Sequence, residues 1–300
     1  LARNRELLLL ALVALVSIAL SRGLLYASES VIHIPSPIVR FLLPYALAPL
    51  LATLLLDSSA GIAAGTWSTL VLAVLMERRF PLVVCGLIAT LMASFLAANV
   101  RTRSKVVKMG TIVGVAQIIC VFAVTATDPQ AADVTRVIHQ SSACLFGGFL
   151  SAFLALLILP ALERLFGVTT NISLLELSDL GHPLLQRLAI EAPGTYHHSL
   201  VVANLASAAA DSIGANSLLA RVCAYFHDVG KLTKPEFFAE NQDRRGNPHD
   251  RLPPSMSTLI ITSHVKEGLS LAMRHKLPPV VTDVIHEHHG TSLLSCFHHK

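Results

Sequence analysis

The sequence predicts an all-α protein in which a polytopic transmembrane helix bundle precedes a polar, all-helical domain. Hydrophobic residues make up 53% of the 300 residues and charged residues only 14%, whereas a soluble domain usually carries about 25% charged residues. The long apolar runs end near residue 162, and most of the 14 histidines follow residue 171. We therefore expect three parts: the bundle at residues 1–162, an amphipathic connector at residues 163–193 and the polar domain at residues 194–300.

Six apolar stretches in the first part are long enough to cross a bilayer, which takes about 20 mainly apolar residues in a helix. A buried core helix or a cleaved signal peptide explains one such stretch, but explains six in succession poorly. We therefore expect the lipid bilayer to surround this part. The six predicted spans are Leu7–Tyr26, Ile38–Leu56, Ala60–Met76, Leu82–Val100, Val107–Ala126 and Ala143–Leu162.

Basic residues between the spans predict the orientation of the bundle. Six spans place both ends on one side, and Lys and Arg favour cytoplasmic loops. The densest basic loop, Arg101–Lys108, falls on the same side as both ends, although Arg78 and Arg79 on the opposite side make the bias modest. We therefore expect the polar domain to lie in the cytosol.

Charge and cysteine content exclude several classes of function. A pump or proton relay usually needs ionisable groups inside the membrane, but Asp57 and Glu77 lie at the ends of spans. The net charge is only +4, with no long basic patch, so we expect no polymeric nucleic acid as a partner. The five cysteines show no CxxC spacing, which is typical of reduced, packed thiols. The bundle is therefore expected to be an anchor or a sensor.

Helical patterns fill the chain after the bundle. The connector alternates leucines with polar residues and is punctuated by Pro183 and by Pro193–Gly194. Helices are then predicted at Ser199–Ile213, Ser217–Asp228 and Ser255–His275, with a polar loop at Asn241–Pro254 and a last helix ending at His289. No segment has the alternation of a strand, so the polar domain is expected to be all-α.

Histidine and aspartate recur across these helices in a pattern that favours a metal centre. Neutral imidazole and carboxylate are suitable ligands for Mn, Fe or Zn ions. A single aspartate can bridge two ions through its two oxygens, and Asp228 is the residue placed for that role. Two ions about 4 Å apart can hold an attacking hydroxide and the oxygens of a phosphate. The predicted metal ligands are His198, His227, Asp228, His264, His288 and His289.

Other polar residues near this pattern allow two interpretations each. Lys231 follows Asp228 closely and is predicted to act with it in catalysis by contacting a phosphate, with a solvated surface lysine as an equal alternative. The polar loop from Glu240 to Asp250 is either a second layer around the metals, a substrate lip or a plain connector. Cys223 is expected to pack rather than to bind metal. Six further histidines of the polar half are set aside as ligands: His182, expected at a helix end, His197, His275, His286, His298 and His299.

Several segments carry a resemblance to a known family. They are LLPYALAPLLATLLLD in the bundle and HHSLVVANLA, AYFHDVGK, FFAENQ, NPHD and HEHHGTSL in the polar domain. These segments resemble the bacterial seven-transmembrane HD-domain phosphohydrolases, that is, the PgpH-like cyclic di-AMP phosphodiesterases, and the resemblance covers essentially the whole chain. It implies an HD-type metallophosphohydrolase domain after the bundle.

The resemblance implies more than the spacing does. It implies two divalent metal ions, Mn or Fe, held by the six predicted ligands with Asp228 bridging. It implies hydrolysis of cyclic di-AMP to linear pApA by a multi-pass protein of the bacterial cytoplasmic (inner) membrane. It also implies a sensor domain and a further span ahead of Leu1, and a further aspartate ligand after Lys300 for which Asp283 is no substitute. The chain is accordingly expected to be a piece of a longer protein.

Two rival functions remain open at this stage. One is a nucleotide-sensing receptor whose HD head no longer turns over substrate. The other is an HD phosphohydrolase of a different nucleotide, such as ppGpp or a deoxynucleoside triphosphate. A homodimer is likewise an open alternative to a monomer.

Overall fold

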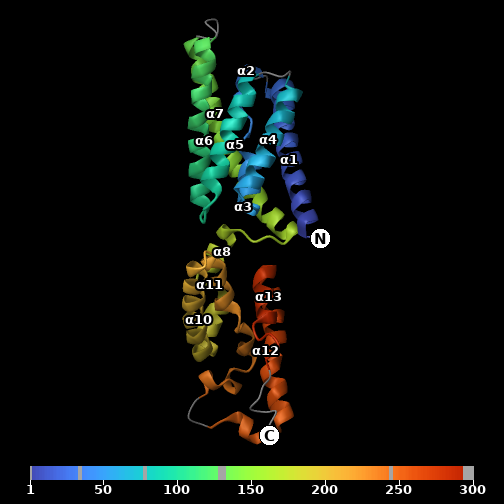
Figure 1. The fold of residues 1–300 in the computed structure, drawn as a ribbon, viewed down its shortest axis with the longest axis vertical. Coiled ribbons are helices and arrows are strands. Elements are labelled where there is room, and N and C mark those ends of the chain that lie inside the picture. Colours follow the sequence, from blue (N-terminus) through green and yellow to red (C-terminus); the bar gives the residue numbers. More distant parts are fainter. Residues whose placement is uncertain (1, 33–35, 77–79, 128–132, 243–245, 293–300) are drawn as a thin grey trace. The chain divides into compact units, whose positions relative to one another are not determined.

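The computed structural model describes residues 2–32, 36–76, 80–127, 133–242 and 246–292. Every regular element in these ranges is helical (Figure 1), as the sequence predicts. The chain splits into two compact units, Leu1–Ile172 and Ser173–Lys300. Residues 163–172 of the predicted connector thus belong to the first unit and residues 173–193 to the second, and the three-part division of the chain stays a prediction.

The first unit is a bundle of long apolar helices. α6 packs along α7, and α4 packs against both α3 and α5. The outer faces expose large apolar side chains such as Phe95, Ile119 and Phe153, as expected where lipid is the solvent. The elements are α1 (Ala2–Ala27), the π-helical turn η1 (Ser28–Ile32), α2 (Ser36–Leu42), α3 (Leu47–Leu55), α4 (Ser58–Leu75), α5 (Phe80–Ala97), α6 (Arg103–Thr127) and α7 (Val134–Phe166).

The second predicted span is interrupted rather than continuous. α2 ends at Leu42 and α3 begins at Leu47, and a turn joins them in which the Tyr45 amide donates to the Leu43 carbonyl. Pro44 in this turn has no amide hydrogen to donate, so it cannot continue the helical hydrogen-bond pattern. The single helix that the hydrophobic run predicts is therefore wrong at this point.

Length and composition agree with a membrane location for this unit. Within the described residues, five helical segments are long and apolar enough to cross a bilayer, one of them Ile38–Leu55, which includes the turn at Pro44. Pro81–Ala97 is apolar but shorter, at the lower limit of about 17 residues. The chain is thus a membrane protein, and its sixth span stays a prediction. Arg78 and Arg79, which weaken the orientation argument, lie outside the described residues.

Glycines allow the helices of the bundle to approach with their backbones in contact. A β-carbon on Gly148 would lie 2.2 Å from the carbonyl oxygen of Gly110, and one on Gly110 would lie 2.5 Å from that of Gly148. Small residues at such crossings are typical of membrane helix pairs. The α6–α7 contact therefore depends on two residues without side chains.

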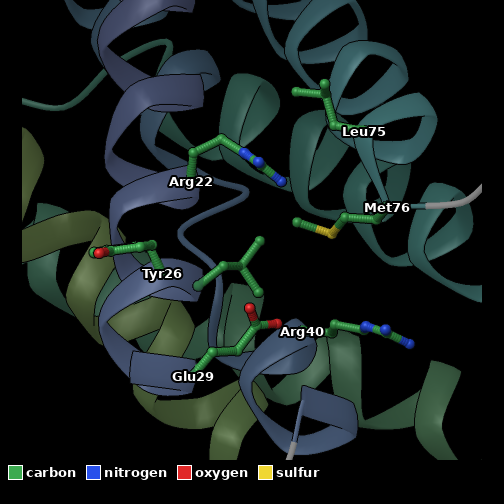
Figure 2. Close-up of a pocket in the computed structure, with 7 residues that line it drawn as sticks. Arg22, Tyr26, Glu29, Arg40, Leu75 and Met76 are labelled. Carbon is green, nitrogen blue, oxygen red and sulfur yellow. The ribbon is translucent and has the colours of Figure 1, made fainter. Parts of the chain in front are cut away.

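A polar cavity of about 200 Å³ opens where α1, α2 and α4 meet. Figure 2 shows Arg22 reaching from α1 toward Met76 at the end of α4, with the Glu29 carboxylate also facing the cavity. Its lining consists of Arg22, Leu25, Tyr26, Glu29, Arg40, Leu75 and Met76.

The second unit is built from shorter helices around its own core. Buried side chains from α9, α11 and α13, including Leu188, Phe226 and Ile285, pack together. The elements are α8 (Asn171–Leu177), which begins in the first unit, α9 (Pro183–Glu191), α10 (Pro193–Ser212), α11 (Ser217–Phe226), the 3₁₀ turns η3 (Val229–Thr233), η4 (Pro235–Phe237), η5 (Ala239–Asn241) and η6 (Pro248–Arg251), α12 (Pro254–Arg274) and α13 (Pro279–Glu287).

The starts of α10 and α9 test two predictions made from the sequence. Pro193 opens α10, because a proline fits the first helical turn, where its missing amide hydrogen is not needed. The prediction that this helix begins at Ser199 is therefore wrong. His182 caps α9, because its Nδ1 accepts a hydrogen bond from the Leu184 amide at 3.3 Å. The prediction that His182 is a helix-end residue is confirmed.

Candidate metal centre

The centre forms around Asp228, which lies between α11 and η3. A close backbone contact places η3 against α12: a β-carbon on Gly230 would lie 1.8 Å from the carbonyl oxygen of His264. Any larger residue at this position would push the two elements apart. Gly230 therefore lets α12 bring His264 directly beside Asp228.

The structure brings all six predicted ligands together. They form two groups that share Asp228, and within each group the possible ligand atoms all lie within 4.8 Å of one another. One group is Asp228, His264, His288 and His289; the other is His198, His227 and Asp228.

The two oxygens of the Asp228 carboxylate face different groups. Oδ2 lies 3.2 Å from Nε2 of His227 and 4.0 Å from Nε2 of His198. Oδ1 lies 3.6 Å from Nε2 of His264 and 3.5 Å from Nε2 of His288. This division is the arrangement that a carboxylate bridging two cations needs.

The Asp228 carboxylate is buried, with 4% of its side chain exposed, and its Oδ1 has no hydrogen-bond partner among the described residues. A buried polar atom without a partner is costly. A cation at Oδ1 would remove that cost, so the residues present fit a metal ion.

Backbone carbonyls orient three of the imidazoles. Nδ1 of His227 lies 2.8 Å from the Ala224 carbonyl oxygen, and Nδ1 of His288 lies 2.9 Å from that of Ile285. Nδ1 of His264 likewise contacts the carbonyl oxygen of Ile261, three residues earlier in the chain. Each Nδ1–H donates to its carbonyl, which leaves the Nε2 lone pair to face the centre.

The nitrogens also converge on one another. Nε2 of His264 lies 3.1 Å from Nε2 of His289 and 3.4 Å from Nε2 of His288. Burial lowers the pKa of His264, and burial with the charge of His288 lowers the pKa of His289. These two imidazoles are therefore neutral near pH 7, which is the form that binds metal.

Neighbouring side chains keep the Asp228 carboxylate ionised. Burial alone would raise the pKa of Asp228, but the neighbouring His227, His288 and Lys231 hold it well below its ordinary value. Burial alone would lower the pKa of His227, yet Asp228 raises it overall. Asp228 is therefore ionised at every pH at which the protein works.

Lys231 is part of the centre rather than a surface residue. Only 13% of its side chain is exposed, and its Nζ lies 2.8 Å from Oδ2 of Asp228 and 2.7 Å from Oε1 of Glu240. Burial alone would lower its pKa, but the charges of Asp228 and Glu240 raise it. The alternative of a solvated surface lysine is therefore wrong.

Three more residues surround Lys231 and Glu240. The sequence did not single out Thr195 or Phe238, and it placed Asn241 only within a polar loop. Phe238 lies under the Lys231 ammonium, with 5.0 Å from Nζ to the ring centroid, and its ring meets His264 edge-on. Thr195 and Asn241 bond to each other and Thr195 also bonds to Glu240. The position of Thr195 one turn before His198 is the signal that points to it.

The residues excluded from the ligand set stay outside both groups within the described chain. His197, His286 and Asp283 are exposed, and the ring of His275 lies 6.0 Å from that of His182. Cys223 is buried, its Sγ lies 3.8 Å from the Val280 carbonyl oxygen, and burial raises the pKa of its thiol to about 11, so its prediction as a packing residue is confirmed. His298 and His299 lie outside the described residues.

Two known families match the chain. Residues 1–170 match the family described as a 7TM receptor with intracellular HD hydrolase. Residues 195–295 match the HD domain. The boundary between the two matches falls in the region between the apolar bundle and the histidine-rich unit.

Curated relatives include the cyclic-di-AMP phosphodiesterase PgpH of Bacillus subtilis, which is 35% identical over 272 residues, covering 87% of this chain and 38% of that protein. The protein of the same name from Listeria monocytogenes is 35% identical over 264 residues, covering 87% of this chain and 37% of its own length. Ribonuclease Y of Acholeplasma laidlawii is 36% identical over 95 residues, or 32% of this chain and 14% of that protein.

A crystal structure of the L. monocytogenes PgpH HD domain is 51% identical in sequence to the matched part, with a TM-score of 0.39, and covers 40% of this chain and 57% of that one. The chain spans less than two fifths of the length of the PgpH relatives that it matches.

Proposed function

Because the chain belongs to the family of 7TM receptors with an intracellular HD hydrolase, we propose that it takes part in hydrolysing cyclic di-AMP to linear pApA with two divalent metal ions. The observation that carries the proposal is the division of the Asp228 carboxylate between two histidine groups. The relatives named cyclic-di-AMP phosphodiesterase support the choice of substrate.

The six clustered side chains are the proposed metal ligands. His198 and His227 would hold one ion with Oδ2 of Asp228, and His264, His288 and His289 would hold the other with Oδ1. When bound, two such ions activate water and neutralise the charge that develops on a phosphate. Mn and Fe suit this mixture of imidazole and carboxylate.

The chain's own groups have further roles in the proposal. Three backbone carbonyls, those of Ala224, Ile261 and Ile285, accept from Nδ1–H of an imidazole. The histidines whose proton is held on Nδ1 in this way are His227, His264 and His288. His198 has 49% of its side chain exposed and His289 is exposed too, so both histidine groups can be reached from solvent. Lys231 lies on the carboxylate and acts as a point charge that helps to orient the substrate phosphate.

The membrane placement is part of the same proposal. We assign the bundle of residues 1–162, with six spans, to the bacterial cytoplasmic membrane and the HD part of residues 194–300 to the cytosol. Support comes from the basic segment Arg101–Lys108 and from the match to a family with an intracellular HD hydrolase. In the structure residues 103–108 of this segment belong to α6, so only residues 101 and 102 lie before that helix. Accessibility of single cysteines at residues 101 and 102 to a membrane-impermeant maleimide, in intact and in broken cells, tests the orientation.

The enzymatic test uses the full-length protein that contains this chain, purified in detergent, with Mn and cyclic di-AMP. We expect pApA to form, and Asp228→Ala to abolish its formation. The absence of pApA from the parent chain together with tight binding of cyclic di-AMP would instead favour the nucleotide-sensing receptor. Parallel reactions with ppGpp and a single-stranded RNA decide between the nucleotide substrates, the RNA because Ribonuclease Y of Acholeplasma laidlawii is 36% identical to this chain over 95 residues.

A further inference from the structure

A continuous chain of polar contacts runs from the proposed metal centre to the start of α10. Nζ of Lys231 lies 2.8 Å from Oδ2 of Asp228 and 2.7 Å from Oε1 of Glu240. The Thr195 hydroxyl donates to the same Oε1 at 3.0 Å. Glu240 thus receives two hydrogen bonds on one oxygen, from residues on two different elements.

Asn241 ties the far end of this chain to a helix end. Its Oδ1 accepts from the Thr195 amide at 3.0 Å, and its Nδ2 donates to the Thr195 hydroxyl at 2.8 Å. Amides in the first turn of a helix have no partner within the helix, so Asn241 supplies one to α10. That helix also carries His198, one turn further on.

Backbone packing leaves Glu240 little freedom. A β-carbon on Gly194 would lie 1.8 Å from the Glu240 carbonyl oxygen, so η5 lies directly against the first turn of α10. Glu240 therefore presents its carboxylate to Lys231 from a backbone position that two elements define. Hydrogen bonds from Lys231 and Thr195 hold the pKa of Glu240 below its ordinary value in spite of its burial.

The net charge of the groups around Asp228 depends on Glu240. Asp228 and Glu240 carry one negative charge each and Lys231 one positive charge, so the three groups together keep one negative charge for a bound cation. Without the Glu240 charge, the Lys231 ammonium would pair with Asp228 alone and the sum would be zero. A charge held within a few ångströms of the ligands changes the affinity of the site for a cation.

We propose that Glu240 is a positioning residue that shares the Lys231 ammonium with Asp228 and thereby keeps the Asp228 carboxylate negative enough to bind metal ions. The inference rests on the proposed metal-dependent function. It assigns Glu240 no contact with the substrate or with the metal ions themselves.

The test is a Mn titration of the full chain in detergent, with free Mn measured by electron paramagnetic resonance. Glu240→Gln keeps the shape of the side chain and an acceptor for Thr195 but removes its charge. We expect this variant to bind Mn about 10–100-fold more weakly than the parent, the range typical when a partner of a metal ligand is removed. Glu236→Gln, the same change on an exposed glutamate of η4, serves as the matched control and should bind Mn like the parent.

A double variant separates the role of charge from a merely structural one. Adding Lys231→Met to Glu240→Gln restores the net charge of one negative unit around Asp228. We expect the affinity for Mn to return to within a few-fold of the parent value, although two native residues are then missing. A structural role for Glu240 would instead predict that the double variant binds Mn at least as weakly as the single one.

Three results would overturn the inference: a Glu240→Gln variant with the affinity of the parent, a Glu236→Gln control that loses as much affinity as Glu240→Gln, and a double variant without recovery. If Glu240→Gln does not fold, Glu240→Asp, which keeps the charge but retracts it, should weaken Mn binding in the same direction. A parent chain that forms pApA while Glu240→Gln keeps its Mn affinity contradicts this inference alone. A parent chain that neither binds Mn nor forms pApA contradicts the proposed function.

Discussion

The two units of the molecule differ in where many of their polar side chains find hydrogen-bond partners. In the bundle, buried hydroxyls such as those of Ser21, Thr90 and Ser151 donate to the carbonyl one turn back in their own helix. In the second unit, the groups around Asp228 bond across three elements, α10, η3 and η5. A bond within one helix makes few demands on its neighbours, whereas bonds between elements make the positions of the side chains around Asp228 depend on several parts of the unit.

The difference predicts where a substitution matters. In the bundle a residue is sensitive when added volume has nowhere to go. In the second unit a residue is sensitive when it carries charge or a hydrogen bond to the centre. The four predictions that follow test this contrast in order of expected effect.

Removing the shared carboxylate has the largest expected effect. Asp228→Ala leaves both histidine groups without their common oxygen ligands, so we expect the rate of pApA formation to fall at least about 1000-fold. Asp283→Ala, an exposed aspartate outside both groups, should keep the parent rate. Equal losses of this rate in the two variants would contradict the role of Asp228 as the shared ligand.

Crowding the contact behind the centre comes next. In Gly230→Ala, the new methyl group would meet the His264 carbonyl oxygen at 1.8 Å, so η3 and α12 must separate. We expect Mn affinity to fall about tenfold and stability by about 1–3 kcal/mol. Gly181→Ala, whose nearest neighbour would be Asp179 Oδ1 at 3.1 Å, is the control. Unchanged Mn binding in Gly230→Ala would show that this contact does not set the geometry.

A glycine-to-alanine substitution at a close contact in the bundle should lower stability, because it disturbs packing and no charged group. Gly148→Ala would place a methyl group 2.2 Å from the Gly110 carbonyl oxygen, and we expect a loss of about 1–3 kcal/mol, seen as a lower thermal midpoint in detergent. Gly23→Ala meets nothing within 4 Å and should raise the midpoint slightly, because alanine favours helix. A higher midpoint for Gly148→Ala would contradict the close contact of α6 with α7.

The smallest effect concerns pH. Burial and the charge of His275 lower the pKa of His182, so the folded state holds His182 neutral while the unfolded chain takes up a proton below about pH 6.5. Stability is therefore lost as pH falls through that value. His182→Asn keeps a helix cap without a titrating group, so its thermal midpoint should fall less than that of the parent between pH 7 and pH 5. Parallel curves for the two proteins would exclude this role.

The sequence was most informative where one residue type repeats at wide spacing. The five ordered histidines and Asp228 predict the centre, because few structural needs place so many polar side chains inside apolar helices. The all-helical class follows in the same way from the apolar runs and the lack of strand alternation.

Features set by tertiary contact were not predictable. The turn at Pro44 interrupts an unbroken hydrophobic run, and only the neighbouring helices decide whether such a run bends. Thr195 bonds to residues 45 and 46 positions away, and Phe238 lies between two three-residue turns, which carry no periodic signal. Pro193 reads as a breaker in isolation but opens a helix, because both roles suit a residue with a fixed φ angle.

The central claim is that Asp228 joins two metal sites through its two oxygens. Electron paramagnetic resonance of the chain loaded with two equivalents of Mn tests it most directly, because two Mn ions bridged by one carboxylate are magnetically coupled. We predict the broad spectrum of a coupled pair in the parent, and its loss in Asp228→Ala. A six-line spectrum of isolated Mn at full loading, unchanged in the variant, would contradict the claim.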